Sequence, residues 1–240
     1  MNLNDIANQK IAAQIFPVAE VSLFARVKNE KIGPLLASQS LAPFGAGMTD
    51  MVMVFSEMKY SGMRFGEIAI TVAAATRNDP KTEYGSFMLT AFNSNPFFAF
   101  VERNIFKAPY RSANIRFSLA ERSFHCAMRG KGGSKDSIEV SLSMPESDPA
   151  HICHERNVLL PGKTNGVLTF FKARIEGETI HKRSQSDTDS VHVNIGLDRL
   201  NRLAAEDINI VGWEIRRAAT HTKYETTVHR IKNARSKYNA

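Results

Sequence analysis

Short apolar runs with alternating polar positions recur along this chain of 240 residues and predict a fold built mainly from strands. In a strand, successive side chains point to opposite faces, so a strand with one buried face alternates apolar and polar residues. Met51–Met58 and Glu67–Ala75 are rich in β-forming residues and are separated by a Ser-Gly pair, which predicts an antiparallel pair with a short connection. Further strands are predicted at Val18–Val27, Ser86–Phe92, Ile115–Leu119, Phe124–Met128, Ile138–Met144, Val167–Ile175, His192–Leu197, Ile208–Ala218 and Tyr224–Val228.

One helix has strong start and stop signals. Asn95 can cap the free amides of a first turn, and Pro96 suits the first helical position, where its missing N–H is not needed. Pro109 disfavours helical backbone at the residue before it, so the helix is expected to stop near Lys107. The apolar face expected to turn toward the interior comprises Phe97, Phe98, Val101 and Ile105.

The remaining helical signals are short and lie between strands. They predict helices from Asn4 to a stop at Pro17, over Asn29–Leu36 and over Asp198–Ala205. Many strands, short polar connections and few helices indicate an α+β fold, a β-rich antiparallel barrel with peripheral helices. No polar linker divides the chain, so residues 1–240 are expected to form one domain, and the tail from Lys232 is polar enough to fray.

The segment that carries Arg103, Ile105, Phe106 and Pro109 follows the order of the signature of the acetoacetate decarboxylase family, in which a proline precedes the Schiff-base lysine. Two upstream segments are also similar to that family: Lys59–Glu67, which resembles a strand leading to a substrate-contacting glutamate, and Glu83–Met88, which resembles the strand after it. The matched region covers roughly Met51–Leu119. The resemblance implies an acetoacetate decarboxylase-like closed β-cone and a homo-oligomer.

Tyr110 stands where that family has its lysine, and Arg111 follows it. An enzyme of this resemblance condenses a buried lysine with a ketone, and the imine accepts electrons as carbon dioxide leaves. Here Tyr110 could instead donate a hydrogen bond to a carbonyl oxygen, which would permit enolisation, dehydration or cyclisation without an imine. The resemblance also implies that Glu67 contacts the substrate. In an apolar cavity the pKa of Glu67 would be raised and suited to proton transfer, although a strand-end glutamate can equally face water.

Three cations near Tyr110 are further candidates. Lys107 could replace the missing nucleophile if the pocket has shifted by one helical turn, with Arg103 and Arg111 lowering its pKa. The alternative is a solvated lysine at a helix C-terminus. Arg103 and Arg111 are the predicted substrate-binding residues, since an arginine can hold a substrate carboxylate with two hydrogen bonds. Arg103 could also simply pair with a carboxylate such as Glu67.

The charge balance restricts the partners without identifying them. Lys and Arg number 31 against 24 Asp and Glu, a formal net charge of +7 that suits anionic substrates as well as nucleic acid. A basic C-terminal region with two aromatic residues would fit nucleic-acid binding, but Arg216 and Arg217 are adjacent and would point to opposite faces of a strand. A solvated or subunit-contact surface is the favoured interpretation, and nucleic acid is not an expected partner.

Other chemistry has weak support in the sequence. In the segment HICHE, His151, Cys153 and His154 could offer metal ligands, but no second pair stands at ligand spacing, so neither a metal nor a cofactor is expected. The glycine-rich segment Gly130–Gly133 matches no phosphate-binding pattern. Two cysteines and no signal segment favour the cytoplasm, and no apolar run is long enough to span a membrane.

Two functional hypotheses follow from these residues. The first is an enzyme that acts on a small or medium keto or carboxylic acid by acid–base chemistry, with Glu67, Tyr110 and Lys107 as catalytic candidates. The second is a binding module for a small apolar acid on the same fold, without turnover.

Overall fold

Strands dominate the computed structural model, which describes residues 10–76, 84–143, 150–161, 167–179, 181–184, 191–197 and 205–230. The elements in chain order are β1 (Ile11–Lys28), α1 (Asn29–Ala37), β2 (Leu41–Pro43), β3 (Met48–Tyr60), β4 (Met63–Thr76), β5 (Tyr84–Asn93), α2 (Pro96–Asn104), β6 (Tyr110–Leu119), β7 (Ser123–Gly130), β8 (Ser137–Ser143), β9 (Ala150–Leu160), β10 (Val167–Thr179), β11 (His181–Ser184), β12 (Val191–Gly196), the 3-10 turn η3 (Ala205–Asp207), β13 (Ile208–Tyr224) and β14 (Thr227–Arg230).

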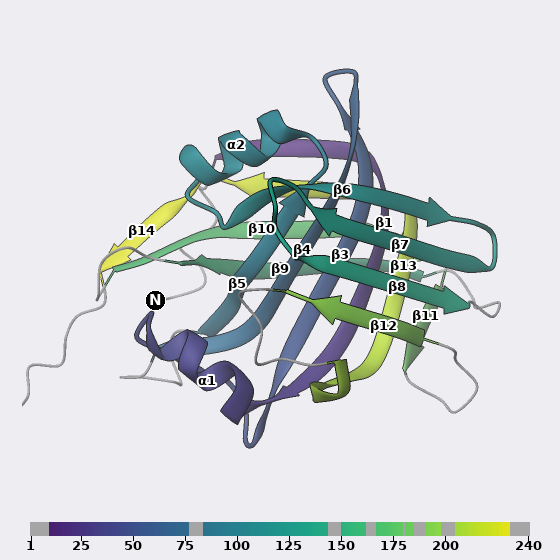
Figure 1. The fold of residues 1–240 in the computed structure, drawn as a ribbon. Coiled ribbons are helices and arrows are strands. Elements are labelled where there is room, and N and C mark those ends of the chain that lie inside the picture. The colour runs from purple at the N-terminus through teal and green to yellow at the C-terminus, as the bar shows by residue number, and fades with distance from the viewer. Residues whose placement is uncertain are drawn as a thin grey trace, which may run out of the picture.

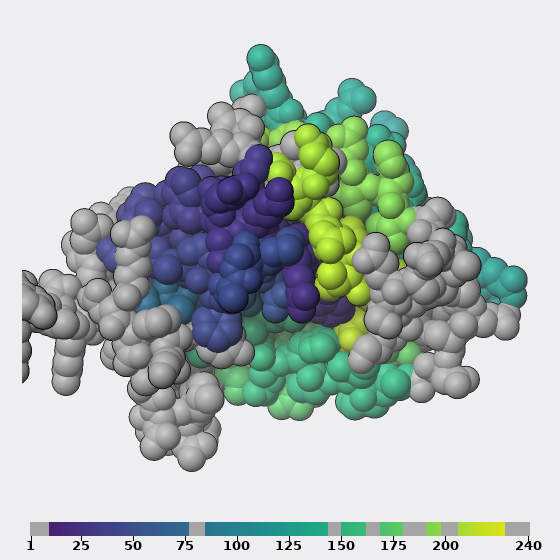
Figure 2. Space-filling model, turned by 90° about the horizontal axis from the view of Figure 1, so that it is seen from below, coloured from purple at the N-terminus to yellow at the C-terminus, as the bar shows by residue number. Residues whose placement is uncertain are grey.

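Seven strands pair in a closed ring in the order β5-β9-β10-β13-β1-β3-β4, and β4 pairs back with β5. All of these pairings are antiparallel except the short seam between β5 and β9, where Ser86 pairs with Val158 in parallel. β1 lies between β3 and β13, although β13 comes almost 200 residues later in the chain. Figure 2 shows these three segments side by side on one face of the molecule. The ring confirms the predicted β-rich closed fold.

A second sheet, β6-β7-β8-β12, continues from the ring through a parallel pairing of β6 with β5. Its strands lie across one side of the ring (Figure 1). The main apolar core joins residues of both layers, and Phe124 of β7 packs edge-on against Phe55 of β3, with ring centroids 5.8 Å apart. β1, β3 and β4 therefore have one face in this core and one face toward the inside of the ring.

β1 shows this division most clearly. Val21, Leu23 and Ala25 are buried in the core between the layers. Glu20 and Ser22, on the opposite face, are also buried but are polar. Because a polar side chain is buried at low cost only when it has hydrogen-bond partners, the inside of the ring must supply them.

The N-terminal helix prediction is wrong over the residues that the structure describes. Ile11–Pro17 belongs to β1, where Ile11 pairs with Tyr224 and Ile15 with His221. The 3.6-residue apolar pattern was outweighed by pairing with the long β13 strand, a tertiary contact that helix propensity does not include. β9 was also not predicted. The predicted helix at Asp198–Ala205 and the tail from Lys232 lie outside the described residues, apart from Ala205 in η3.

The helix predicted after Asn95 is present as α2, and its cap is confirmed, because the Asn95 side chain accepts a hydrogen bond from the Phe97 amide at 2.9 Å. Its predicted buried face is only partly right: Phe98 packs against Phe65, with ring centroids 4.6 Å apart. Phe97 and Ile105 are 61% and 65% exposed, and the helix buries Ala99 instead. It also ends at Asn104, about one turn before Lys107. Residue spacing identifies which side chains share a helix face, but it does not say which face the sheet covers.

Candidate active site

A small cavity of about 160 Å³ lies at one end of the ring interior and is bordered by every ring strand. Most of its lining is aliphatic, aromatic or methionine side chains. The described lining residues are Ala13, Ile15, Val54, Met58, Glu67, Ala69, Thr71, Met88, Glu102, Tyr110, Arg156, Val158, Phe171, Ala173, Arg174, Ile175, His221, Thr222 and Lys223. Polar groups thus converge on a mostly apolar surface, as is usual in small-molecule sites. Seven of the lining residues are ionisable: Glu67, Glu102, Tyr110, Arg156, Arg174, His221 and Lys223.

Glu67 lies on β4 and borders the cavity. The preceding residue, Gly66, lets β6 approach closely, because a Cβ there would lie 3.0 Å from Ile115 Cγ2. Asn93 Nδ2 donates a hydrogen bond to Glu67 Oε2 at 3.2 Å. Burial, and then the charge of Glu102, raise the pKa of Glu67, while a hydrogen bond from Tyr110 partly opposes them. Glu67 can therefore hold a proton at a higher pH than an ordinary glutamate.

Tyr110 begins β6 and is 6% exposed. Its placement comes from the parallel pairing with Ala91 of β5 and from an Ala91 amide that donates to Pro109 O at 3.3 Å. Burial, and then the nearby Glu67 carboxylate, raise the pKa of Tyr110 well above its usual value. The phenol therefore keeps its proton and donates a hydrogen bond to Glu67. Glu67 and Tyr110, here called the Glu67 pair, are brought together in one cavity as the sequence predicted.

The three predicted cations are not among the described residues that line the cavity. Lys107 is exposed, and its Nζ donates to Asn104 O at 2.5 Å. Its φ of +59° turns the chain away from the helix, so the prediction that Lys107 takes the nucleophile's place is not supported by the geometry. Arg103 is exposed, and Arg111 pairs with Asp136 at 2.6 Å. Arg111 follows Tyr110 in a strand and therefore points to the other face.

Lys223 and Glu102 line the cavity but were not predicted to do so. Lys223 comes from the end of β13 and Glu102 from α2, and their charged ends lie 2.5 Å apart. The Lys223 amine also lies over the rings of Phe106 and Phe171, at 4.0 and 4.6 Å from the centroids. The basic residues near the C-terminus were expected on the surface, because the length of β13 and its place in the ring are not evident from the sequence.

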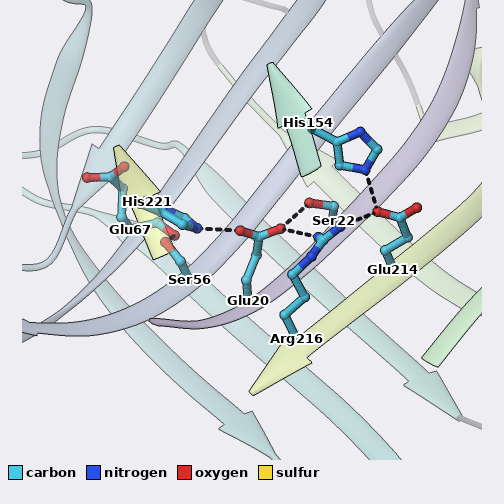
Figure 3. A network of polar contacts seen from close by, with 8 residues as sticks. All are labelled: Glu20, Ser22, Ser56, Glu67, His154, Glu214, Arg216 and His221. Atoms are coloured by element: carbon cyan, nitrogen blue, oxygen red, sulfur yellow. Dashed lines mark hydrogen bonds and ion pairs between the residues drawn. The ribbon is translucent and has the colours of Figure 1, made fainter. Parts of the chain in front are cut away.

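A chain of buried ion pairs fills the ring next to the cavity (Figure 3). It is called the Glu20 network and consists of His221, Glu20, Ser22, Arg216, Glu214 and His154. Arg216 is completely buried and donates from Nη1 to Glu20 at 3.0 Å and from Nη2 to Glu214 at 2.7 Å. At one end of the network, Glu214 Oε2 lies 2.6 Å from His154 Nε2, and at the other end Glu20 contacts His221 Nε2. His221 alone of these residues also lines the cavity.

Both carboxyl groups of the network have a pKa below the ordinary value. Burial raises the pKa of Glu20, but His221, Arg216 and Ser22 together lower it below its ordinary value. Burial likewise raises the pKa of Glu214, yet His154 and Arg216 bring it down to about 2. The expected opposition of Arg216 and Arg217 is confirmed, since Arg217 is exposed and bonds Ala120 O.

The HICHE segment lies on β9 and its side chains diverge. His154 points into the ring toward Glu214, whereas Cys153 is exposed. Among the residues that the structure describes, no three His, Cys, Asp or Glu side chains are grouped so as to hold a metal ion. Nor does any helix within the described ranges have the length and apolar character needed to cross a membrane.

Comparison with solved structures identifies the fold. The chain is similar to acetoacetate decarboxylase (TM-score 0.62, 10% identity, 97% of this chain and 100% of that chain) and to the acetoacetate decarboxylase of Legionella pneumophila (0.59, 13%, 91% and 88%). It is also similar to the enduracididine biosynthesis enzyme MppR complexed with pyruvate (0.56, 12%, 92% and 92%). No family model and no curated protein matches the sequence. The acetoacetate decarboxylase-like resemblance is thus confirmed in the fold.

Proposed function

We propose that this protein is an enzyme that performs acid–base chemistry on a small keto or carboxylic acid, with Glu67 as the proton-transfer group and Tyr110 as a hydrogen-bond donor. The observation that carries the proposal is the Glu67 pair at the edge of an apolar cavity, where the pKa of Glu67 is raised. Perturbed carboxyl groups in clefts are typical of general acids and bases.

The size of the cavity supports a small substrate. Its volume of about 160 Å³ is close to that of an engineered protein cavity of about 150 Å³ that accommodates benzene, a molecule of six heavy atoms. Side chains such as Met88, Val158 and Phe171 suit a short carbon skeleton. One structural neighbour is described with pyruvate bound, which also has six heavy atoms. A short keto acid is therefore the substrate class we favour.

Chemistry without a lysine imine is favoured by the positions of the lysines. Tyr110 occupies the sequence position of the family's lysine, and Lys107 lies outside the cavity lining. Lys223 borders the cavity, but its Nζ is already engaged by the Glu102 carboxylate and is not a free amine like the one that attacks a carbonyl. Tyr110 and protonated Glu67 can instead stabilise negative charge that develops on a carbonyl oxygen during enolisation.

The test is hydrogen–deuterium exchange at the methyl carbon of pyruvate in D₂O, followed by proton NMR, with pyruvate binding measured separately by calorimetry. Wild-type protein should accelerate the exchange. Glu67→Gln should lower the rate by about 100-fold or more at similar affinity, the loss typical of a missing general acid–base group. Glu139→Gln, an exposed glutamate of β8, is the matched control and should keep the wild-type rate. Binding without exchange would overturn the proposal and favour a binding module.

A further inference from the structure

The Glu20 network reaches the cavity at one point, the imidazole of His221. His221 and Glu67 both line the cavity. The two side chains come from β13 and β4, which are separated in the ring by β1 and β3. A substrate in the cavity would therefore meet ionisable groups from two separate parts of the ring.

We propose that His221 is a second catalytic residue of this cavity and that Glu20 is the positioning residue that holds its imidazole; this inference rests on the proposed function. Figure 3 shows His221 between Glu67 and Glu20, with its Nε2 directed at the Glu20 carboxylate. Because Nε2 is engaged by Glu20, Nδ1 is the ring nitrogen available to a substrate.

Glu20 is built to stay in place and ionised. It is completely buried, one oxygen contacts His221, and the other accepts from Ser22 Oγ at 2.7 Å and from Arg216 Nη1 at 3.0 Å. Ser22 and Glu20 lie on the same face of β1, and Arg216 is paired with Glu20 in the β1–β13 register. A carboxylate fixed by three partners can fix the orientation of the imidazole that it contacts, as in catalytic triads.

The contact with Glu20 also serves proton transfer. In a catalytic triad, a buried carboxylate stabilises the imidazolium that forms when the histidine accepts a proton. Glu20 contacts His221 in the same way, and Arg216 holds Glu20 in place.

Two proton-transfer groups narrow the reaction class to keto–enol interconversion or a reaction that proceeds through an enol. Nδ1 of His221 removes a proton from the carbon next to the carbonyl, and the electrons of that C–H bond form the carbon–carbon double bond. The carbonyl π electrons move to oxygen, which takes the proton of Glu67 while Tyr110 donates a hydrogen bond. One proton leaves carbon and one reaches oxygen, so no oxidant or reductant is needed.

Chemical rescue with imidazole tests this role. His221→Ala should lower the exchange rate of the pyruvate methyl protons by about 100-fold with little change in pyruvate affinity, as for a lost general base. Added imidazole should restore much of the rate, because it can occupy the space beside Glu20. The double variant His221→Ala/Glu20→Gln should not be rescued, since the imidazole would lack its positioning partner. Rescue of this kind is not expected from a purely structural histidine.

His125→Ala is the matched control, because this exposed histidine of β7 also contacts a glutamate, Glu139, and should keep the wild-type rate. A wild-type rate in His221→Ala, or a loss that imidazole does not restore, would overturn the role of His221. If His221→Ala does not fold, His221→Gln decides: loss of exchange at unchanged affinity supports the role, and unchanged exchange overturns it. If Glu67→Gln loses exchange but His221→Ala keeps it, the proposed function stands and only the role of His221 is overturned. If the wild-type protein shows no exchange, the proposed function and the role of His221 are both overturned.

Discussion

The Glu67 pair and the Glu20 network each place a glutamate inside the same ring, but the pKa values of these two glutamates shift in opposite directions. Glu67 has one tyrosine donor, one amide donor and a second carboxylate nearby, and its pKa is raised. Glu20 is more deeply buried, yet its pKa is lowered, because His221, Arg216 and Ser22 surround it. Burial is the largest contribution in both cases and has the same sign, so the partners decide the outcome.

The difference in pKa gives the two glutamates different roles at the cavity. A carboxyl group with a raised pKa can exchange its proton, whereas a carboxylate held by cations cannot do so readily and instead fixes its neighbours. The Glu20 network therefore supplies fixed charge, and the Glu67 pair supplies a transferable proton. Under the inference above, His221 is the point where the fixed charge meets the substrate.

Removal of Arg216, the central cation of the Glu20 network, should have the largest effect, and that effect is on stability. Arg216→Met leaves Glu20 and Glu214 buried without their shared arginine, which should reduce the free energy of unfolding by about 3–5 kcal/mol. Urea denaturation measures it, with Arg217→Met as the exposed control, expected to change the stability by less than about 0.5 kcal/mol. In a Glu20→Gln/Glu214→Gln background, the cost of Arg216→Met should shrink; an unchanged cost would show that packing alone explains the loss.

Tyr110→Phe should affect catalysis more than stability. The variant keeps the ring but loses the donor, so the exchange of pyruvate methyl protons should fall by about 100-fold, the effect of one missing oxyanion-type donor. The hydrogen bond from Tyr110 lowers the pKa of Glu67, so the pKa of Glu67 should rise further in the variant. Carbon NMR of the Glu67 carboxyl measures this shift. A fall in that pKa would contradict the proposed contact between the two side chains.

The pH dependence of stability should separate the two regions by sign. Glu214 has a folded pKa of about 2 against an ordinary 4.5, so its contribution, roughly 2 kcal/mol once solvent screening is allowed for, is present above pH 4.5 and is lost as the pH falls toward 2. Glu67 has a folded pKa above 4.5, so its effect is the reverse: stability is lost as the pH rises from 4.5 through the folded value. Urea unfolding of wild type, Glu67→Gln and Glu214→Gln on both sides of pH 4.5 measures these effects. Each substitution should remove the pH dependence that its own glutamate contributes. Equal slopes in all three proteins would contradict both assignments.

The sequence allowed the Glu67 pair to be predicted but not the Glu20 network, and the reason is physical. Glu67 and Tyr110 lie within a region whose residue order resembles known enzymes. Strands were predicted at Glu67–Ala75 and Ile115–Leu119, although β6 begins at Tyr110, before the second of these predictions. Glu20 and Arg216 are 196 residues apart, and only the closure of the ring brings them together. Composition and periodicity cannot show that Arg216 is buried, because a strand pattern does not reveal which distant strand supplies its partner carboxylates.

Substitution of Lys107 is expected to have the smallest effect on stability and on the exchange rate. It tests whether residues outside the cavity lining take part in the reaction. Lys107 is exposed, with φ at +59°, a conformation that glycine adopts without the steric cost paid by other residues. In Lys107→Gly the relief of strain and the added flexibility of the unfolded chain oppose each other, so stability should change by no more than about 1 kcal/mol. The exchange rate should stay within about twofold of wild type, as for other surface changes. A loss comparable with that of Tyr110→Phe would instead place Lys107 in the reaction and restore a lysine-dependent mechanism.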